Sequence, residues 1–157
     1  MEKESKLKLE IVTPYGLILS EDVDEVTCTG SEGDFGVLPG HVPFFTTLKV
    51  GMIIYKKGNT TKYVFVNWGY AEVGPERVMI LADSAEKSDQ IDVERAKAAM
   101  KRADERLKKV EEFDFARATA SLERAVMRSQ IAENAAHKLF ENASDIFKGY
   151  AFMHGLF

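Results

Sequence analysis

The spacing of the apolar residues changes near residue 86, and this change constrains the fold more than any other feature of the sequence. Before it, apolar and polar residues alternate, as in Leu7, Leu9 and Ile11, and short apolar runs are separated by turn-forming segments. After it, apolar residues recur at spacings of three and four, and proline is absent. The first part therefore predicts a β-sandwich or small barrel, and the second predicts α-helices.

The helical part contains two apolar stripes that are rich in alanine. They consist of Val93, Ala96, Met100, Ala103, Leu107 and Val110, and of Phe115, Ala118, Leu122, Ala125, Ser129, Ala132 and Ala136. Two helices with a short connection indicate an antiparallel hairpin. Alanine side chains bury little area, at roughly 25 cal/mol per Å². We therefore expect the hairpin to be held weakly and to be a candidate for a moving part.

Composition excludes several classes of protein. The chain has 157 residues and a net charge of -4, so whole-chain binding to nucleic acid is not indicated. Cys28 is the only cysteine, which leaves no disulfide framework and no zinc-binding spacing. From the charged N-terminal residues and the lack of a long apolar run we expect no signal peptide and no membrane-spanning segment, and at most a peripheral place at a membrane.

A loop rich in glycine and proline carries the most specific signal. It reads GSEGDFGVLPGH over residues 30–41 and is typical of tight turns between strands. Its order closely resembles the loop that marks the epsilon subunits of F-type ATP synthases. The resemblance continues at residues 47–51, 66–73 and 78–86, and then through both predicted helices to about residue 134.

The resemblance implies a ten-stranded antiparallel β-sandwich over residues 1–86, followed by a helical hairpin over 87–134. The apolar extension over 135–157 departs from the family pattern, since many members end soon after the second helix. The resemblance also implies a non-catalytic subunit of a proton- or sodium-translocating synthase, at the cytoplasmic face of a bacterial plasma membrane. In this family the sandwich binds the gamma subunit and the c-ring. The helices inhibit ATP hydrolysis when they extend into the alpha/beta hexamer.

The resemblance further implies that loop residues face the c-ring. Asp34 corresponds to the loop acid that faces the c-ring in this family, and Glu32 and His41 are its neighbours in the motif. For Glu32, a solvated turn residue is an equal alternative. For His41, the favoured alternative is a turn residue whose ring bonds to local backbone.

A second motif lies at the start of the first helix. Residues 91–96 match the pattern Ile/Leu-Asp-x-x-Arg-Ala of epsilon subunits that bind ATP, and the resemblance implies a set of ATP-binding residues. The set is Glu86, Ile91, Asp92, Arg95, Ala96, Arg102, Arg124 and Arg128. Asp92 serves either to accept hydrogen bonds from adenine or to cap the helix. The alternative for the arginines is a solvated helix face.

Helical spacing adds an argument about charge that is independent of the resemblance. Arg124 and Arg128 have no acidic neighbour within their own helix, whereas Arg95 has Asp92 in reach and Arg102 has Glu105. Unpaired arginines suit a polyphosphate. No phosphate-binding loop of the Gly-x-x-x-x-Gly-Lys-Ser/Thr type is present, so ATP is expected as a regulatory ligand and not as a substrate or required cofactor.

Two rival interpretations come from other functional classes. An enzyme is disfavoured because the sequence offers no catalytic constellation and no metal-ligand cluster. A freestanding adaptor or chaperone is compatible with the composition, and the apolar stretch beyond residue 135 suits it. Such a stretch is expected to dock on this protein or on a partner. Co-purification with gamma and the alpha/beta hexamer distinguishes the synthase subunit from the adaptor.

Overall fold

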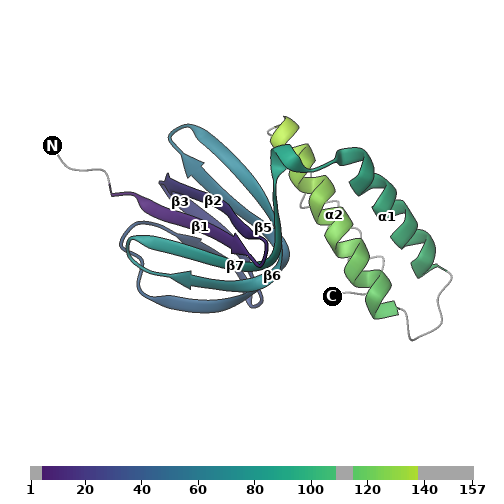
Figure 1. Cartoon of the computed structure of the whole chain (residues 1–157), viewed down its shortest axis with the longest axis horizontal. Helices are drawn as coiled ribbons and strands as arrows, with labels where there is room; N and C mark the ends of the chain where they lie inside the picture. The colour runs from purple at the N-terminus through teal and green to yellow at the C-terminus, as the bar shows by residue number, and fades with distance from the viewer. Residues whose placement is uncertain (1–4, 109–114, 138–157) are drawn as a thin grey trace.

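The structure is a computed structural model, and it describes residues 5–108 and 115–137. Within these residues a β-domain is followed by two helices (Figure 1). The strands are β1 Leu7–Thr13, β2 Gly16–Val23, β3 Glu25–Gly30, β4 Gly33–Val37, β5 Phe44–Lys57, β6 Thr60–Val73 and β7 Arg77–Lys87. A 3-10 turn, η1 Ser88–Gln90, leads into α1 Val93–Leu107, and α2 is Phe115–His137. The predicted order of a β-domain followed by helices is confirmed.

The sheet differs from the expected one in two respects. Among the described residues it has seven strands rather than ten, in the order β2-β1-β7-β6-β5-β3-β4. The count is lower because β5 and β6 are 14 residues each and continue without a break. The pairing is also not wholly antiparallel, since β1 and β7 run parallel. These two strands are far apart in sequence, so no turn between them signals their direction.

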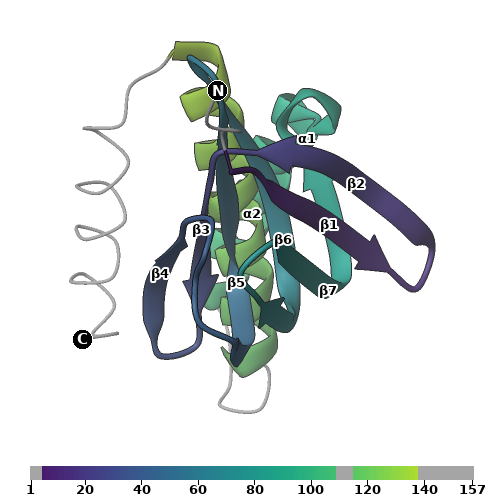
Figure 2. The same cartoon turned by 90° about the vertical axis from the view of Figure 1, so that its left-hand side faces the viewer.

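The core of the β-domain follows from the alternation in the strands. Leu7, Leu9 and Ile11 point inward from β1 and are fully buried, as the period of two predicts. They pack with the inward residues of the other strands into one apolar cluster. β2 and β4 form the two opposite edges of the sheet (Figure 2). The opposite, outer face of β5 and β6 is the one on which the helices pack.

Two successive residues of β6 with positive φ mark a point where two backbones lie close together. Trp68 has φ 53° and Gly69 has φ 148°, so both lie in the left-handed region, which is unusual for tryptophan. A Cβ at Gly69 would lie 2.0 Å from the carbonyl oxygen of Leu81 on β7. Glycine is therefore required at this position, both for φ and for space.

The helical hairpin is attached to the β-domain through α2. Ile131 and Ala132 of α2 form a second apolar cluster with Val50, Tyr63 and Phe65 on the outer face of β5 and β6. The buried residues of α1 itself are two alanines, Ala96 and Ala103, and its partner is α2. The predicted alanine seam between the helices is therefore present. Weak attachment of the hairpin stays a prediction.

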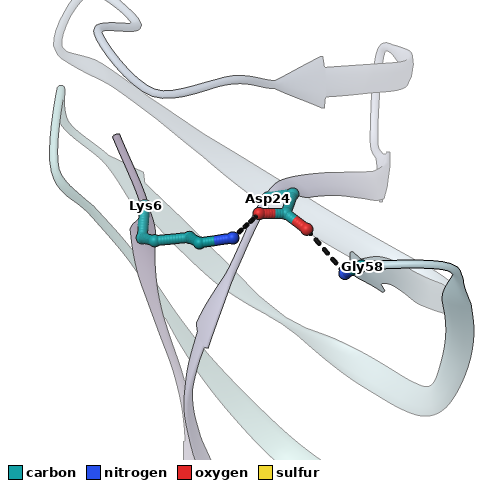
Figure 3. Close-up of polar contacts among 3 residues, drawn as sticks. All are labelled: Lys6, Asp24 and Gly58. Carbon is teal, nitrogen blue, oxygen red and sulfur yellow. Dashed lines mark hydrogen bonds and ion pairs between the residues drawn. The ribbon is translucent and has the colours of Figure 1, made fainter. Parts of the chain in front are cut away.

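Three chain segments meet at Asp24, between β2 and β3 (Figure 3). Its carboxylate accepts a hydrogen bond from Lys6 Nζ, and its second oxygen accepts one from the backbone N–H of Gly58 at 2.7 Å. The hydrogen bond from Lys6 contributes most to lowering the pKa of Asp24, and the bond from Gly58 lowers it further. The carboxylate thereby ties the start of β1 to the β5–β6 turn.

We expect Asp24→Asn to lower the midpoint of thermal unfolding at pH 7, because both partners stabilise the charged form. A carboxyl with a lowered folded pKa adds stability above its unfolded pKa of about 3.9, and this stability is lost as the pH falls through the lower folded value. The difference between wild type and variant should therefore be full at pH 7 and shrink below about pH 4. Circular dichroism melts measure it.

Asp22→Asn is the matched control, because Asp22 is an exposed carboxylate that lies 3.6 Å from Lys8 Nζ. An equal loss in both variants, or a difference for Asp24→Asn that persists at low pH, would contradict the role given to Asp24.

Candidate functional site

A pocket of about 290 Å³ lies where the end of β7, η1 and the two helices meet. Seven of the eight residues of the predicted ATP-binding set line it. They are Glu86, Ile91, Asp92, Arg95, Ala96, Arg102 and Arg128. These residues come from three elements and the linker before α1, so the hairpin fold itself brings them together. The volume is at the low end of the range of ligand pockets, about 300–1,000 Å³.

Local sequence explains how α1 presents its side chains to the pocket. Asp92 has extended backbone angles, and its Oδ1 accepts a hydrogen bond from the backbone N–H of Arg95 at 3.0 Å. It is thus the N-cap of α1, one of the two roles that the sequence left open. Arg95 and Arg102 are seven residues apart, which places them on the same side of the helix two turns apart.

Arg128 is held from two directions. Phe65 on β6 and Glu86 on β7 are cross-strand partners, and both meet this arginine of α2. Its Nε donates to Glu86 Oε2 at 2.7 Å, and its Cζ lies 4.1 Å from the centroid of the Phe65 ring. The side chains are 28% and 41% exposed for Arg128 and Glu86, so the pair lies at the mouth of the pocket. The planar guanidinium suits both contacts.

This arrangement corrects the predicted distribution of charge. The expectation of an arginine without a partner is wrong for Arg128, because its carboxylate comes from β7, which in-helix spacing cannot detect. Conversely, Arg95 and Arg102 have no ion-pair partner within the part of the chain that the structure describes. Asp92, which was expected to be in reach of Arg95, meets its backbone N–H instead. The two pocket-lining arginines without an ion pair, Arg95 and Arg102, are therefore both on α1.

Arg124 is the member of the predicted set that does not line the pocket. Its Nη2 donates to Ser121 Oγ at 3.2 Å, one turn back along α2. Sequence reasoning also missed three residues that do line the pocket, Gln90, Ala99 and Ala125. Ala125 belongs to the apolar stripe of the second helix, and Ala99 lies about one turn beyond Ala96 on the first. Gln90 had no signal, because it lies just before the motif.

The predicted c-ring residues lie in a separate part of the β-domain. Glu32 is exposed in the β3–β4 turn, and Asp34 is exposed on the edge strand β4, opposite Thr29 of β3. The loop of residues 30–41 thus contains a strand as well as turns. Ser31 pins the turn to β5, since its Oγ accepts a hydrogen bond from Thr47 Oγ1 at 2.7 Å.

His41 lies in the loop after β4 and is half-buried. Its Nδ1 is 2.7 Å from the carbonyl oxygen of Val42, so in the tautomer with a proton on Nδ1 the ring donates to local backbone. This is the alternative that the sequence favoured. Among the described residues His41 contacts Val42 and Phe44. The role of Glu32, Asp34 and His41 toward a c-ring stays a prediction.

A second and larger cavity, of about 530 Å³, contains none of the predicted residues. It lies between the β5–β6 hairpin, η1 and the end of α2, and its walls include Tyr55, Tyr63 and Asp89. Burial raises the pKa of Tyr55 to about 12, with smaller contributions from Glu21 and Asp89, so its hydroxyl stays protonated. The smaller pocket is the candidate site because its arginines supply charge for a ligand.

Two kinds of reactive group can be assessed in the described residues, a metal cluster and the cysteine thiol. Within them no cluster of three or more His, Cys, Asp or Glu side chains is placed to hold a metal ion. Burial, with a smaller contribution from Asp34, raises the pKa of Cys28 to about 12, so the thiol is not an activated nucleophile. None of the helices in residues 5–108 and 115–137 has the length and apolar character needed to cross a membrane.

Comparison with known proteins agrees with this architecture. Residues 6–88 match the family model of the ATP synthase delta/epsilon chain beta-sandwich domain, and residues 89–133 match that of its long alpha-helix domain. The ATP synthase epsilon chain of Geotalea uraniireducens is 53% identical over 135 residues, covering 85% of this chain and 98% of that one. That of Thermodesulfovibrio yellowstonii is 56% identical over 108 residues, covering 69% and 77%.

Solved structures share the fold. A chain of the Euglena gracilis mitochondrial ATP synthase superposes with a TM-score of 0.71 at 24% identity, covering 85% of this chain and 82% of that one. A chain of the Tetrahymena thermophila central stalk and c-ring assembly gives 0.54 at 15% identity, covering 83% and 98%.

These matches cover both halves of the chain and define its class. The chain belongs to the delta/epsilon family of ATP synthase subunits, and within it to the bacterial F-type epsilon chains. Subunits of this kind are structural and regulatory rather than catalytic. The enzyme and the freestanding adaptor are therefore no longer needed as explanations.

We expect Arg128→Ala to lower the free energy of unfolding by about 1–2 kcal/mol, because it removes a cation–π contact and an ion pair at the mouth of the pocket. Urea unfolding followed by circular dichroism measures the change. Arg124→Ala is the matched control, since that arginine is on the same helix and bonds only to Ser121 among the described residues. Equal losses in the two variants would contradict the anchoring role of Arg128.

Proposed function

We propose that this chain is the central-stalk subunit that couples the catalytic head of its synthase to the c-ring and restrains ATP hydrolysis through α1 and α2. Family membership supports the stalk role, since the Tetrahymena neighbour belongs to a central stalk and c-ring assembly. Restraint by the helices is supported by their attachment to the sheet, which is made mainly by α2, with Ile91 and Val93 beside it. Such an attachment can be released as a unit, which a moving inhibitory element requires.

Gamma is proposed as the partner of the exposed outer face of β5, β6 and β7. Phe45 and Tyr70 stack there with ring centroids 5.7 Å apart, and Leu81 lies opposite Tyr70 on the neighbouring strand. These side chains are 63%, 50% and 44% exposed. A cluster of exposed aromatic residues on a rigid sheet is typical of a protein interface. The c-ring is assigned to the β3–β4 turn with Glu32 and Asp34, and His41 beside it.

ATP is proposed as the ligand of the pocket. The single observation that carries this is the convergence of Arg95, Arg102 and Arg128 on one space between the helices, with two of them lacking an ion pair among the described residues. Arginines bind phosphate bidentately and are not titrated at physiological pH. A bound polyphosphate bridges α1 to α2 and to Glu86 of β7 by way of Arg128. It therefore stabilises the compact arrangement and opposes extension into the alpha/beta hexamer.

The location follows from these proposals. The β-domain meets the c-ring from the side of the catalytic head, which places the chain at the cytoplasmic face of a bacterial plasma membrane as a peripheral subunit. The coupling ion, a proton or sodium, is bound by the c-ring, and the sequence of this chain does not identify it.

We expect removal of residues 88–157 to raise ATP hydrolysis by a synthase reconstituted with the shortened chain, because the inhibitory element is then absent. Steady-state ATPase activity of complexes with full-length and shortened chains tests this. Co-purification with gamma serves as the control for assembly. Equal hydrolysis by two fully assembled complexes would refute the restraining role.

We expect the double variant Arg95→Ala/Arg102→Ala to raise the Kd for ATP at least about tenfold, because hydrogen bonds to charged groups each contribute ~1.5–3 kcal/mol. Isothermal titration of the full chain at up to millimolar ATP measures binding. Arg106→Ala removes an arginine from the same helix that is not among the pocket-lining residues, and should leave the Kd unchanged. Wild-type protein that shows no saturable binding would overturn the proposal.

A further inference from the structure

Gln90 is the pocket residue whose chemistry the sequence did not explain. It lies on η1, directly before Ile91 and Asp92, and is exposed. Together these three residues form the end of the pocket at the N-terminus of α1. Arg102 lies seven residues beyond Arg95, which at 1.5 Å per residue is about 10 Å along the helix. The pocket thus extends from a polar, uncharged group toward an arginine.

The side chains of the pocket differ in what they can donate and accept. Its arginines only donate hydrogen bonds, and a carboxylate, as at Glu86 and Asp92, only accepts them. Glu86 is already bonded to Arg128, and Asp92 caps α1. Among the described residues that line the pocket, Gln90 alone carries a side chain that both donates and accepts. Its amide has no hydrogen-bond partner within the described part of the chain.

This combination matches one edge of a purine. Adenine presents the N6 amino donor beside the N7 acceptor, and a glutamine amide meets both at once. Guanine presents two acceptors, O6 and N7, so the amide oxygen then faces an acceptor. The buried side chains of Ile91 and Ala96 and the half-buried Ala99 supply apolar surface for the face of a base.

We propose that Gln90 is a specificity-determining residue that selects an adenine base over guanine in this pocket. The inference rests on the proposed function, because it takes the ligand to be a nucleoside triphosphate. Gln90 holds the base at the η1 end, while the arginines of α1 hold the phosphates. Asp92 then acts through the helix that it caps, as a positioning residue.

The test uses the full chain and three nucleotides, ATP, GTP and 7-deaza-ATP, which lacks only the N7 acceptor. For wild type we expect GTP and 7-deaza-ATP to bind about fivefold more weakly than ATP, the effect of one neutral hydrogen bond. In Gln90→Ala the three affinities should converge to within about twofold. In Gln90→Glu, which keeps the acceptor and loses the donor, ATP and 7-deaza-ATP should bind equally.

Asp89→Ala is the matched control, since Asp89 belongs to the same turn but lines the other cavity. It should keep the wild-type ratios. A fivefold penalty for 7-deaza-ATP that persists in both Gln90 variants would overturn the role of Gln90 and leave ATP binding intact. The same holds if wild type binds the three nucleotides equally. Absence of saturable ATP binding by wild type would overturn the proposed function together with this inference.

Discussion

The contact of α2 with the outer face of β5 and β6 is the constraint on which the rest of the arrangement depends. Phe65 is fully buried there, against Ile131, and also carries the guanidinium of Arg128 on its ring. Burial of a phenylalanine or isoleucine side chain contributes about 1.5–3 kcal/mol each. α1 packs on α2 through alanines, so its position relative to the sheet depends mainly on that of α2. If α2 leaves the sheet together with α1, Arg128 loses its contacts with Glu86 and Phe65, and the pocket loses the wall that β7 supplies.

Binding at the pocket and packing at the sheet are therefore linked. Glu86 lies near the end of β7, and its ion pair orients Arg128 at the mouth of the pocket. A ligand that requires Arg128 in this orientation binds only the docked form of the helices, and so shifts the equilibrium toward it. The exposed aromatic face at Phe45 and Tyr70 lies on the same strands but does not take part in this contact.

The sequence predicted what depends on local period and on motif. The change near residue 86 and the two helices were found because each follows from spacing along one element. Seven of the pocket residues were predicted from the resemblance to a known family. What the sequence could not predict depends on contacts between distant segments. The partner of Arg128 is 42 residues away, and the parallel pairing of β1 with β7 joins the two ends of the β-domain. Gln90 was missed since a lone amide carries no pattern. The extension over 138–157 lies outside the described residues.

The parallel pairing of β1 with β7 also has a consequence for folding on the ribosome. Leu9 lies opposite Val78 and Ile11 opposite Ile80, so the first strand cannot find its inner neighbour until about 70 later residues have been made. Closing such a long loop is entropically unfavourable. Until β7 is made, the backbone groups of β1 that pair with it have no strand partner. The helices emerge directly after β7, at the moment when the sheet that will hold them is completed. The order of synthesis thus favours a finished sheet before the two helices can dock on it.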